Sequence, residues 1–381
     1  MIWYGILTAV FLLEAAFIAV CRRREAVRGT RTRRVWIGPV IALACLAGIS
    51  VWSLSNAAIV LLHLCVFLFV GMCVDGVVSL VLRRRAEREA EASAENEKKA
   101  AAGREGSSCV WIAAFVACAL WLGLGFCAAH HVWRTEYPLT TDKPLAQESL
   151  RIAQISDTHI GVTMDADGFA KKLKSVMEEK PDLVVITGDF TDESTTREDM
   201  LGSCRALGEL QTKYGVYFVF GNHDCSDDGD REFTVAELEA ALRLNGVVVL
   251  RDEVKLVADD FYIVGRRDTS ESRKSIAELM ETVDTSRYVI VLDHQPGDFP
   301  KEAAAGADLV LTGHTHGGQL MPLGLMARML PMVFGDAEFL YGQRMYGTTA
   351  CIVSSGMSSW EFRFKTGTVS EYVIVDVKTG K

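Results

Sequence analysis

The sequence predicts an α/β domain in residues 150–381, preceded by an α-helical membrane anchor of about four spans in residues 1–134. From residue 150 onwards, short β-branched or apolar runs alternate with amphipathic segments, which is the pattern of an α/β fold. The charge divides in the same way, because residues 1–134 carry 15 Lys/Arg against 9 Asp/Glu and the remainder carries 25 against 40. The acidic balance of the second part disfavours nucleic acid as a partner, since it repels phosphate.

Four apolar runs in the first part are each long enough to cross a bilayer. They cover residues 1–20, 35–54, 59–82 and 110–130, with residues 53–58 expected as a turn. Basic residues concentrate in the loops after the first and third runs. The positive-inside rule therefore predicts a multi-pass protein of the cell membrane, with these loops in the cytoplasm and the α/β domain on the extracytoplasmic side.

Three ionisable residues, Glu14, His63 and Asp75, lie within the expected spans. A residue of this kind at membrane depth is a functional hypothesis by default, but isolated examples are more often structural. We interpret the bundle as an anchor instead of a transport or relay device. For the whole chain, a non-catalytic metal-dependent sensor or transporter is a remote alternative. Residues 135–149 contain Pro138 among polar residues, so an exposed linker is expected there.

Strands and helices follow in order along the second part. Strands are expected at residues 151–156, 183–187, 216–220, 247–250, 261–265, 288–292, 308–312, 349–354, 360–364 and 369–377. Helices are expected at residues 169–179, 197–213, 235–244 and 274–282. This alternation predicts a domain with much buried sheet.

Five of the expected strands end in residues that can bind metals. The residues at these ends are Asp157, His159, Asp189, Asp192, Asn222, His223, His294, His314 and His316. Ligand sites form at the carboxyl ends of strands in open α/β sheets. Each residue taken singly also fits a helix cap, a turn or an ordinary histidine, but chance placement at five successive strand ends is a poor account.

The stretch at residues 313–319, Gly-His-Thr-His-Gly-Gly-Gln, is the centre of this pattern. It places two imidazoles one residue apart at the end of a strand, in a turn where glycines allow close approach of the backbone. Such a pair can point at adjacent metal ions.

The motifs Asp-x-His, Gly-Asp-x-x-Asp, Gly-Asn-His-Asp, a lone His and Gly-His-x-His occur in this order over residues 151–377. In this the chain resembles the calcineurin-like metallophosphoesterases. The Gly-His-Thr-His-Gly-Gly-Gln stretch and the anchor look most like membrane-associated bacterial phosphodiesterases and transmembrane proteins with a metallophosphoesterase domain. The resemblance implies a fold of two packed β-sheets flanked by helices for residues 150–381.

The resemblance also assigns ligands to two divalent metal ions. The first ion would take Asp157, His159, Asp189 and His316. The second ion would take Asp189, Asn222, His294 and His314, so that Asp189 bridges them. Imidazole, carboxylate and amide ligands suit Mn, Fe or Zn, and the absence of thiolate argues against a closed structural zinc site.

Two ions of this kind can share a hydroxide and clamp the oxygens of a phosphoryl group during in-line displacement. His223 is the expected group that protonates the leaving oxygen or stabilises the transition state. By resemblance, Asp192 would orient His223. For Asp224, a capping or supporting role is as good an interpretation as a functional one.

We therefore expect a membrane-anchored phosphoesterase that hydrolyses phosphodiester or pyrophosphate bonds, including lipid-linked or cell-envelope substrates such as UDP-diacylglucosamine-type pyrophosphates. A phosphomonoesterase or a nucleotide phosphodiesterase is the alternative. The natural substrate, the metal and the oligomeric state stay open. The methionine-rich residues 320–339 are interpreted as a covering or membrane-contacting loop, with an acyl-chain groove as the alternative.

Overall fold

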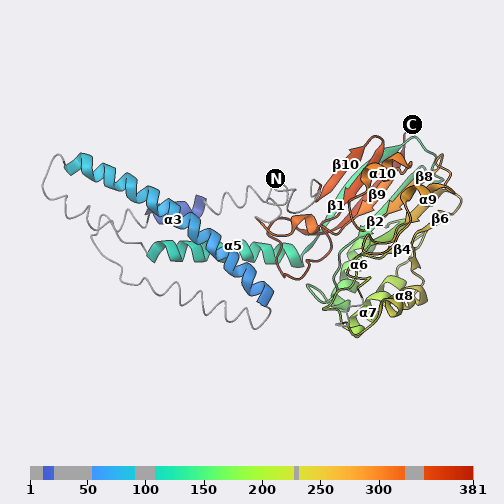
Figure 1. Cartoon of the computed structure of the whole chain (residues 1–381), viewed down its shortest axis with the longest axis horizontal. Helices are drawn as coiled ribbons and strands as arrows, with labels where there is room; N and C mark the ends of the chain where they lie inside the picture. The colour runs from blue at the N-terminus through green and yellow to red at the C-terminus, as the bar shows by residue number, and fades with distance from the viewer. Residues whose placement is uncertain (1–11, 21–53, 91–107, 227–230, 322–338, 381) are drawn as a thin grey trace. The chain divides into compact units, whose positions relative to one another are not determined.

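The computed structural model describes residues 12–20, 54–90, 108–226, 231–321 and 339–380 (Figure 1). The chain divides into two compact units, residues 1–125 and residues 126–381. We describe each unit by itself.

Two helices among the described residues are long and apolar enough to cross a membrane. α3 (Leu54–Ala90) contains the candidate span Leu54–Arg85 with a mean hydropathy of 2.7, and α5 (Ser108–His130) contains Val110–His130 with 2.2. They coincide with the spans expected at residues 59–82 and 110–130.

The described residues therefore hold two candidate spans instead of about four. The span expected at residues 35–54 lies almost wholly outside them, and of residues 1–20 only the helical segment 12–20 is described. The turn expected at residues 53–58 is wrong, because α3 begins at Leu54. That segment contains neither glycine nor proline, so nothing in it opposes helix formation.

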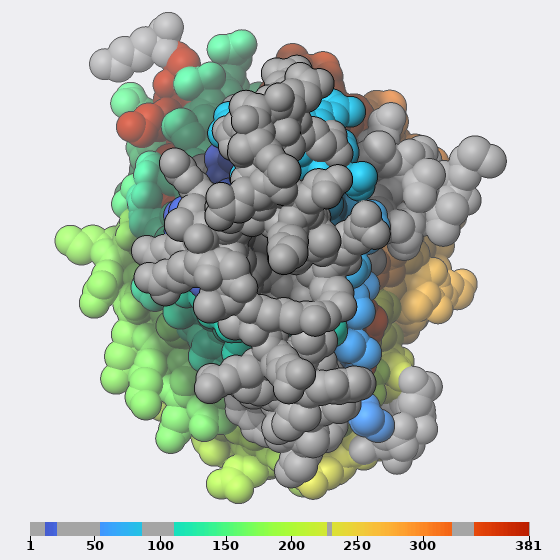
Figure 2. Space-filling model, turned by 90° about the vertical axis from the view of Figure 1, so that its left-hand side faces the viewer, coloured from blue at the N-terminus to red at the C-terminus, as the bar shows by residue number. Residues whose placement is uncertain are grey.

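α3, part of which is seen in light blue in Figure 2, carries a surface of exposed apolar side chains. Phe69, Met72 and Val77 are 64%, 58% and 62% exposed. Large exposed apolar surfaces mark contacts with a membrane or a protein. Together with the length of the two helices, this surface supports association with a membrane.

The second unit contains two six-stranded sheets. The first has the order β1-β12-β2-β3-β4-β5 and comprises β1 (Val132–Thr141), β2 (Ser149–Ile155), β3 (Leu183–Thr187), β4 (Val216–Val219), β5 (Val248–Val249) and β12 (Ser370–Thr379). The second has the order β10-β11-β9-β8-β7-β6 and comprises β6 (Glu253–Val257), β7 (Phe261–Gly265), β8 (Tyr288–Leu292), β9 (Leu309–Thr312), β10 (Gly342–Tyr346) and β11 (Thr349–Val353). The sequence prediction missed the strands β1, β6 and β10, and it also missed the helix at Phe299–Ala304.

The two sheets pack face to face and carry helices on their outer faces, which confirms the expected fold. The inner core joins residues of both sheets, including Ile152, Val185, Ile290 and Leu311. Outside the first sheet lie α6 (Ala166–Glu178), α7 (Arg197–Gly208) and α8 (Val235–Leu244), and outside the second lie α9 (Ile276–Met280) and α10 (Phe299–Ala304). Strands covered on both faces explain the continuous apolar runs of the sequence.

The linker expected at residues 135–149 is wrong over its first half. β1 pairs in parallel with β12 along its whole length, from Val132 opposite Ser370 to Thr141 opposite Thr379. Pro138 suggested a break in regular structure, but β1 is the outermost strand of its sheet, where a residue without an N–H is tolerated. β1 thus begins at Val132, with only His131 between it and the end of α5 at His130.

Residues 360–364 do not form the expected strand, because they belong to an irregular segment between β11 and β12. The methionine-rich stretch expected as a loop falls mostly in residues 322–338, outside the described residues.

Candidate metal centre

The strand ends expected to carry ligands meet at one edge of the second unit. β2, β3 and β4 are parallel to one another in the first sheet, and β8 is parallel to β9 in the second. Backbone hydrogen bonds join the turns that follow: Asp157 N–H donates to Gly188 O at 3.0 Å, and Gly313 N–H donates to His294 O at 2.9 Å. The polar residues after these strands are therefore held together by main chain as well as by sheet.

Six of the expected ligands form two groups, and within each group the ligand atoms lie within 4.8 Å of one another. The first group is Asp157, His159 and His316. The second group is Asp189, His294 and His314. This partition agrees with the assignment that the sequence resemblance implies.

Asp189 belongs to the second group and also approaches the first. Its Oδ2 atom is 3.7 Å from His159 Nε2 and 3.1 Å from His294 Nε2, as a shared ligand requires. Asn222 Oδ1 is 3.2 Å from His294 Nε2, which places it beside the second group. All seven residues expected as metal ligands are thus brought together.

In the first group, the Nε2 atoms of His159 and His316 face each other at 3.2 Å. Burial would lower the pKa of His159, but its hydrogen bond to Asp192 and the charge of Asp189 raise that pKa above its ordinary value. Burial and the charge of His159 hold the pKa of His316 well below its ordinary value. The two Nε2 atoms can therefore share one proton. A bound cation would take the place of that proton and be coordinated by both nitrogens.

The second group repeats this arrangement, with His294 Nε2 and His314 Nδ1 3.3 Å apart. Burial would lower the pKa of His294, but the neighbouring Asp189 raises it well above its ordinary value. Burial and the charge of His294 lower the pKa of His314 to about 4. In each pair the two nitrogen atoms face a common position, so there are two such positions. Each donor set fits a divalent metal ion.

The carboxylates of the centre are buried, with Asp157 0% and Asp189 1% exposed. Burial raises the pKa of Asp157, although the charge of His294 opposes it. Burial would also raise the pKa of Asp189, but His294 beside it holds that pKa below its ordinary value. Buried carboxylates need nearby positive charge, which bound cations would supply.

Five of the seven expected ligands have a backbone conformation that residues with side chains rarely adopt. The φ angles are 49° at Asp157, 36° at His159, 48° at Asp189, 69° at His314 and 47° at His316. Such residues cost on the order of 1–3 kcal/mol each and persist only where the surrounding structure fixes them. Their concentration at these strand ends marks a functional site.

Two glycines allow the turns to approach this closely. A Cβ atom at Gly313 would lie 1.9 Å from Ser156 Oγ and 2.1 Å from Asp157 Oδ2. A Cβ atom at Gly221 would lie 2.1 Å from Asp189 Oδ1. These glycines are needed because no side chain fits between ligand-bearing turns.

The structure pairs Asp192 with His159 instead of His223, so the expected role of Asp192 is corrected. Asp192 Oδ2 lies 3.1 Å from His159 Nδ1. Its other oxygen accepts the backbone N–H and hydroxyl of Ser194 at 2.8 and 2.6 Å, and this turn directs the carboxylate inward. His223 Nδ1 instead lies 3.2 Å from Glu193 Oε1. The sequence spacing could not distinguish two adjacent carboxylates.

His223 itself lies at the centre, as expected. Its backbone N–H donates to Asp189 Oδ1 at 3.0 Å, and its ring centroid is 5.2 Å from that of His159. Asp224 has the supporting role: its carboxylate accepts the backbone N–H groups of Phe190 and Thr191 at 3.2 and 2.8 Å.

Sequence reasoning missed two buried charged residues that fix the turn after β11. The ammonium of Lys365 donates to the carbonyls of Ser355 and Gly356, and Glu371 accepts the N–H of Ser355 at 3.0 Å. Burial lowers the pKa of Lys365 to about 7. A Cβ atom at Gly356 would lie 2.7 Å from Asp157 Cβ, so this turn packs directly on a ligand. No motif in the sequence marks these two residues.

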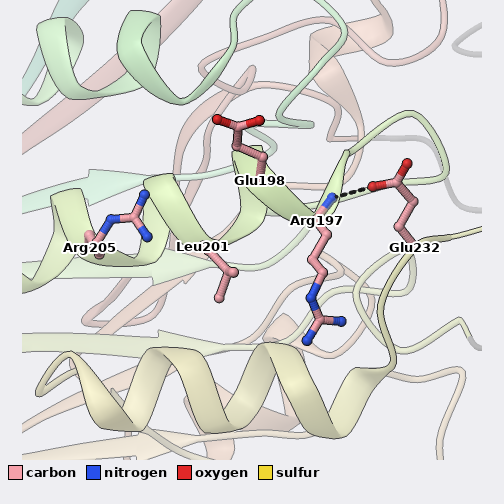
Figure 3. Close-up of a pocket in the computed structure, with 5 residues that line it drawn as sticks. All are labelled: Arg197, Glu198, Leu201, Arg205 and Glu232. Carbon is pink, nitrogen blue, oxygen red and sulfur yellow. Dashed lines mark hydrogen bonds between the residues drawn. The ribbon is translucent and has the colours of Figure 1, made fainter.

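A separate hollow of about 410 Å³ lies on α7 (Figure 3). Its lining residues are Arg197, Glu198, Leu201, Arg205 and Glu232. The guanidinium of Arg197 pairs with Glu237 at 2.8 Å, and the backbone N–H of Arg197 donates to Glu232 at 2.9 Å, so the charges of the hollow are mixed and partly neutralised. None of its residues belongs to the metal centre, which has the convergent ligands and the strained backbone.

Comparison with known proteins agrees with this geometry. Residues 150–318 match the family model described as calcineurin-like phosphoesterase. An uncharacterized metallophosphoesterase of Aquifex aeolicus is 31% identical over 255 residues, which cover 64% of this chain and 90% of that protein. A transmembrane protein with metallophosphoesterase domain from Danio rerio is 29% identical over 283 residues, covering 70% of this chain and 61% of that protein.

Solved structures match less closely. A crystal structure of a Thermus thermophilus protein aligns with 55% of this chain and 90% of its own, at 13% identity and a TM-score of 0.36.

Proposed function

The chain belongs to the calcineurin-like metallophosphoesterases, and on this premise we propose that it is a membrane-anchored enzyme that hydrolyses phosphodiester or pyrophosphate bonds with two divalent metal ions. The observation that carries the proposal is that Asp189, a member of the second ligand group, also lies 3.7 Å from His159 Nε2 of the first group. A pair of sites sharing one carboxylate suits two-metal chemistry.

The first ion would be held by Asp157, His159 and His316, and the second by Asn222, His294 and His314, with Asp189 common to both. When bound, the two ions supply positive charge to the phosphoryl oxygens and an activated water. The metals would be Mn, Fe or Zn, in keeping with nitrogen and oxygen ligands.

His223 would donate the proton to the leaving oxygen. The contact of its Nδ1 with Glu193 leaves Nε2 as the nitrogen that exchanges a proton with substrate. Glu193 orients the ring, and Asp192 orients the ligand His159 through the nitrogen opposite the metal position.

The proposed substrates are lipid-linked or cell-envelope diesters and pyrophosphates, of which UDP-diacylglucosamine-type pyrophosphates are an example. The two apolar helices and the Danio rerio relative with a transmembrane name support an enzyme at a membrane. We also propose that the second unit lies on the extracytoplasmic side of the membrane. The orientation is tested with a reporter fused after Lys381. If a reporter that is active only in the cytoplasm is active there, the proposed orientation is overturned.

Catalysis is tested on purified full-length protein, stripped of metal with a chelator and reloaded with Mn. We expect two metal ions per chain and faster hydrolysis of bis(p-nitrophenyl) phosphate than of p-nitrophenyl phosphate. Asp189→Ala should be inactive, whereas Asp142→Ala, which removes an exposed carboxylate of the same unit, should be unchanged. Undiminished activity in the chelated protein would overturn the proposal, and a preference for the monoester would favour a phosphomonoesterase.

A further inference from the structure

Gln319 ends the Gly-His-Thr-His-Gly-Gly-Gln stretch, but it is not one of the expected ligands. It is 8% exposed, and its side-chain Oε1 accepts the N–H of Trp360 at 3.0 Å. Its Nε2 donates to the carbonyls of Trp360 and Phe362 at 3.0 and 3.4 Å. Its own carbonyl accepts the N–H groups of Thr366 and Gly367. One buried residue thus holds both ends of the segment 360–367.

The indole of Trp360 lies beside His223, with ring centroids 5.6 Å apart. His223 in turn lies 5.2 Å from His159. Exposure rises along this row, from 0% at the His159 side chain to 17% at the His223 side chain and 41% at Trp360. The row leads from the metal centre to solvent, and it ends in a large apolar face.

The same segment is tied to a metal ligand. Ser358 O lies 3.3 Å from His316 Nδ1, and Gln319 follows the short 3₁₀ turn η2 (His316–Gly318). Gln319 therefore connects the turn that carries a ligand to the turn that carries Trp360. A displacement of this glutamine would move the indole relative to the metal centre.

Further along, the segment contacts the last turn of α5. The rings of Phe364 and Phe126 lie 6.2 Å apart, and Ser370 Oγ donates to Ala129 O at 2.8 Å. α5 is one of the two candidate spans. The chain between Trp360 and Ser370 thus contacts both His223 and the last turn of α5, which belongs to the second unit.

We propose that Trp360 forms the wall of a subsite for a large apolar organic group on the leaving side of the phosphoester, and that Gln319 is the positioning residue that holds it there. The reason for the leaving side is the contact of Trp360 with His223, the proposed proton donor. Tryptophan provides a rigid apolar face for either an aromatic ring or an alkyl chain. The substrate class rests on the proposed function, whereas the binding preference can be measured without turnover.

The turnover test uses full-length protein and three methyl phosphodiesters whose leaving alcohols are matched in acidity: a compact fluoroalcohol, a substituted phenol and a long-chain fluoroalcohol. We expect Trp360→Ala to lower kcat/KM about 10–100-fold for the apolar esters, mainly through KM, and to change the compact ester less than about twofold. Trp360→Phe should retain most of the preference. The phenol and long-chain arms distinguish an aromatic from an alkyl occupant.

The matched control is Trp133→Ala, which removes another exposed indole, 38% exposed, from β1 of the same unit. It should leave the preference unchanged. An equal loss on all three esters in Trp360→Ala would make Trp360 a structural residue and overturn the subsite.

A binding test separates this inference from the proposed function. Metal-loaded wild-type protein should bind phenylphosphonate or decylphosphonate more tightly than methylphosphonate by calorimetry, and Trp360→Ala should abolish that difference. If the preference is present but no ester is hydrolysed, the proposed function fails and the subsite stands. Equal affinities in the wild type would overturn the subsite.

Gln319→Ala should lower the apolar preference in the same way as Trp360→Ala while metal content stays at the wild-type level. Gln319→Glu keeps an acceptor for the N–H of Trp360 but loses the donor, so we expect an intermediate effect. Loss of metal in Gln319→Ala would show that the residue supports His316 instead and would overturn its positioning role.

Discussion

The two ligand groups of the metal centre differ in how firmly their imidazoles are held. In the first group both are buried and are fixed through the nitrogen away from the metal position, His159 by Asp192 and His316 by the carbonyl of Ser358. In the second group His294 is fixed by the carbonyl of Thr187 at 2.8 Å.

His314 and Asn222, by contrast, are only partly buried. The first position is therefore closed and the second is open on one side. Supporting hydrogen bonds and burial stabilise a metal site. We infer that the first ion is bound more tightly and exchanges more slowly, and that substrate approaches from the second.

Asp189→Ala should remove the difference between the two ligand groups, because Asp189 approaches histidines of both. We expect loss of both metals and a fall in kcat/KM well beyond the ~10–100-fold typical of supporting residues. Metal analysis and turnover measure this. Retention of one ion at full occupancy would show that Asp189 belongs to one group only.

His316→Ala and His314→Ala compare the groups directly. The first substitution should remove an ion that added metal does not restore, with nearly complete loss of activity. The second should raise the metal concentration needed for half-maximal activity ~10-fold or more, with recovery at high metal. A metal titration of both variants gives the answer, and identical curves would remove the distinction between a closed and an open position.

His223→Ala should separate metal binding from proton transfer. We expect a ~10²–10⁴-fold lower kcat, the range for loss of a general acid, with both ions still bound. Single-turnover kinetics on metal-loaded protein provide the measurement. A loss below tenfold would exclude His223 from the proton-transfer step.

Asp192→Ala should weaken metal at the first position ~10–100-fold, because His159 loses the partner that orients it. Asp192→Asn is the matched control, since its amide oxygen can still accept from His159. Calorimetric metal binding compares the two. Equal affinity in Asp192→Ala and wild type would show that burial alone orients His159.

Glu193→Gln should have the smallest effect. Its carboxylate is half-exposed beside His223, and ion pairs in that setting are worth ~0–1 kcal/mol, so we expect kcat to fall less than about tenfold with unchanged metal affinity. If kcat falls more in Glu193→Gln than in Asp192→Ala, the carboxylate partner of His223 matters more for turnover than the partner of His159.

The order of motifs was enough to predict which side chains meet, because parallel strands bring their ends to one edge. It could not predict how Asp192 and Glu193 divide their partners, since that depends on the turn made with Ser194. Lys365 and Glu371 escaped prediction because both lie outside the motifs in sequence, and the backbone groups of Ser355 and Gly356 that they contact leave no signal in a sequence.

The pairing of β1 with β12 has a consequence for any attempt to prepare the enzyme without its helices. A fragment starting at residue 149 would lack β1 and would leave β12 as a long outer strand, ten residues with the apolar centre Tyr372-Val373-Ile374-Val375. Exposed apolar edges of this length recruit strands from other molecules and aggregate. A shortened chain should therefore start before Val132, so that β1 still pairs with β12 and blocks self-association.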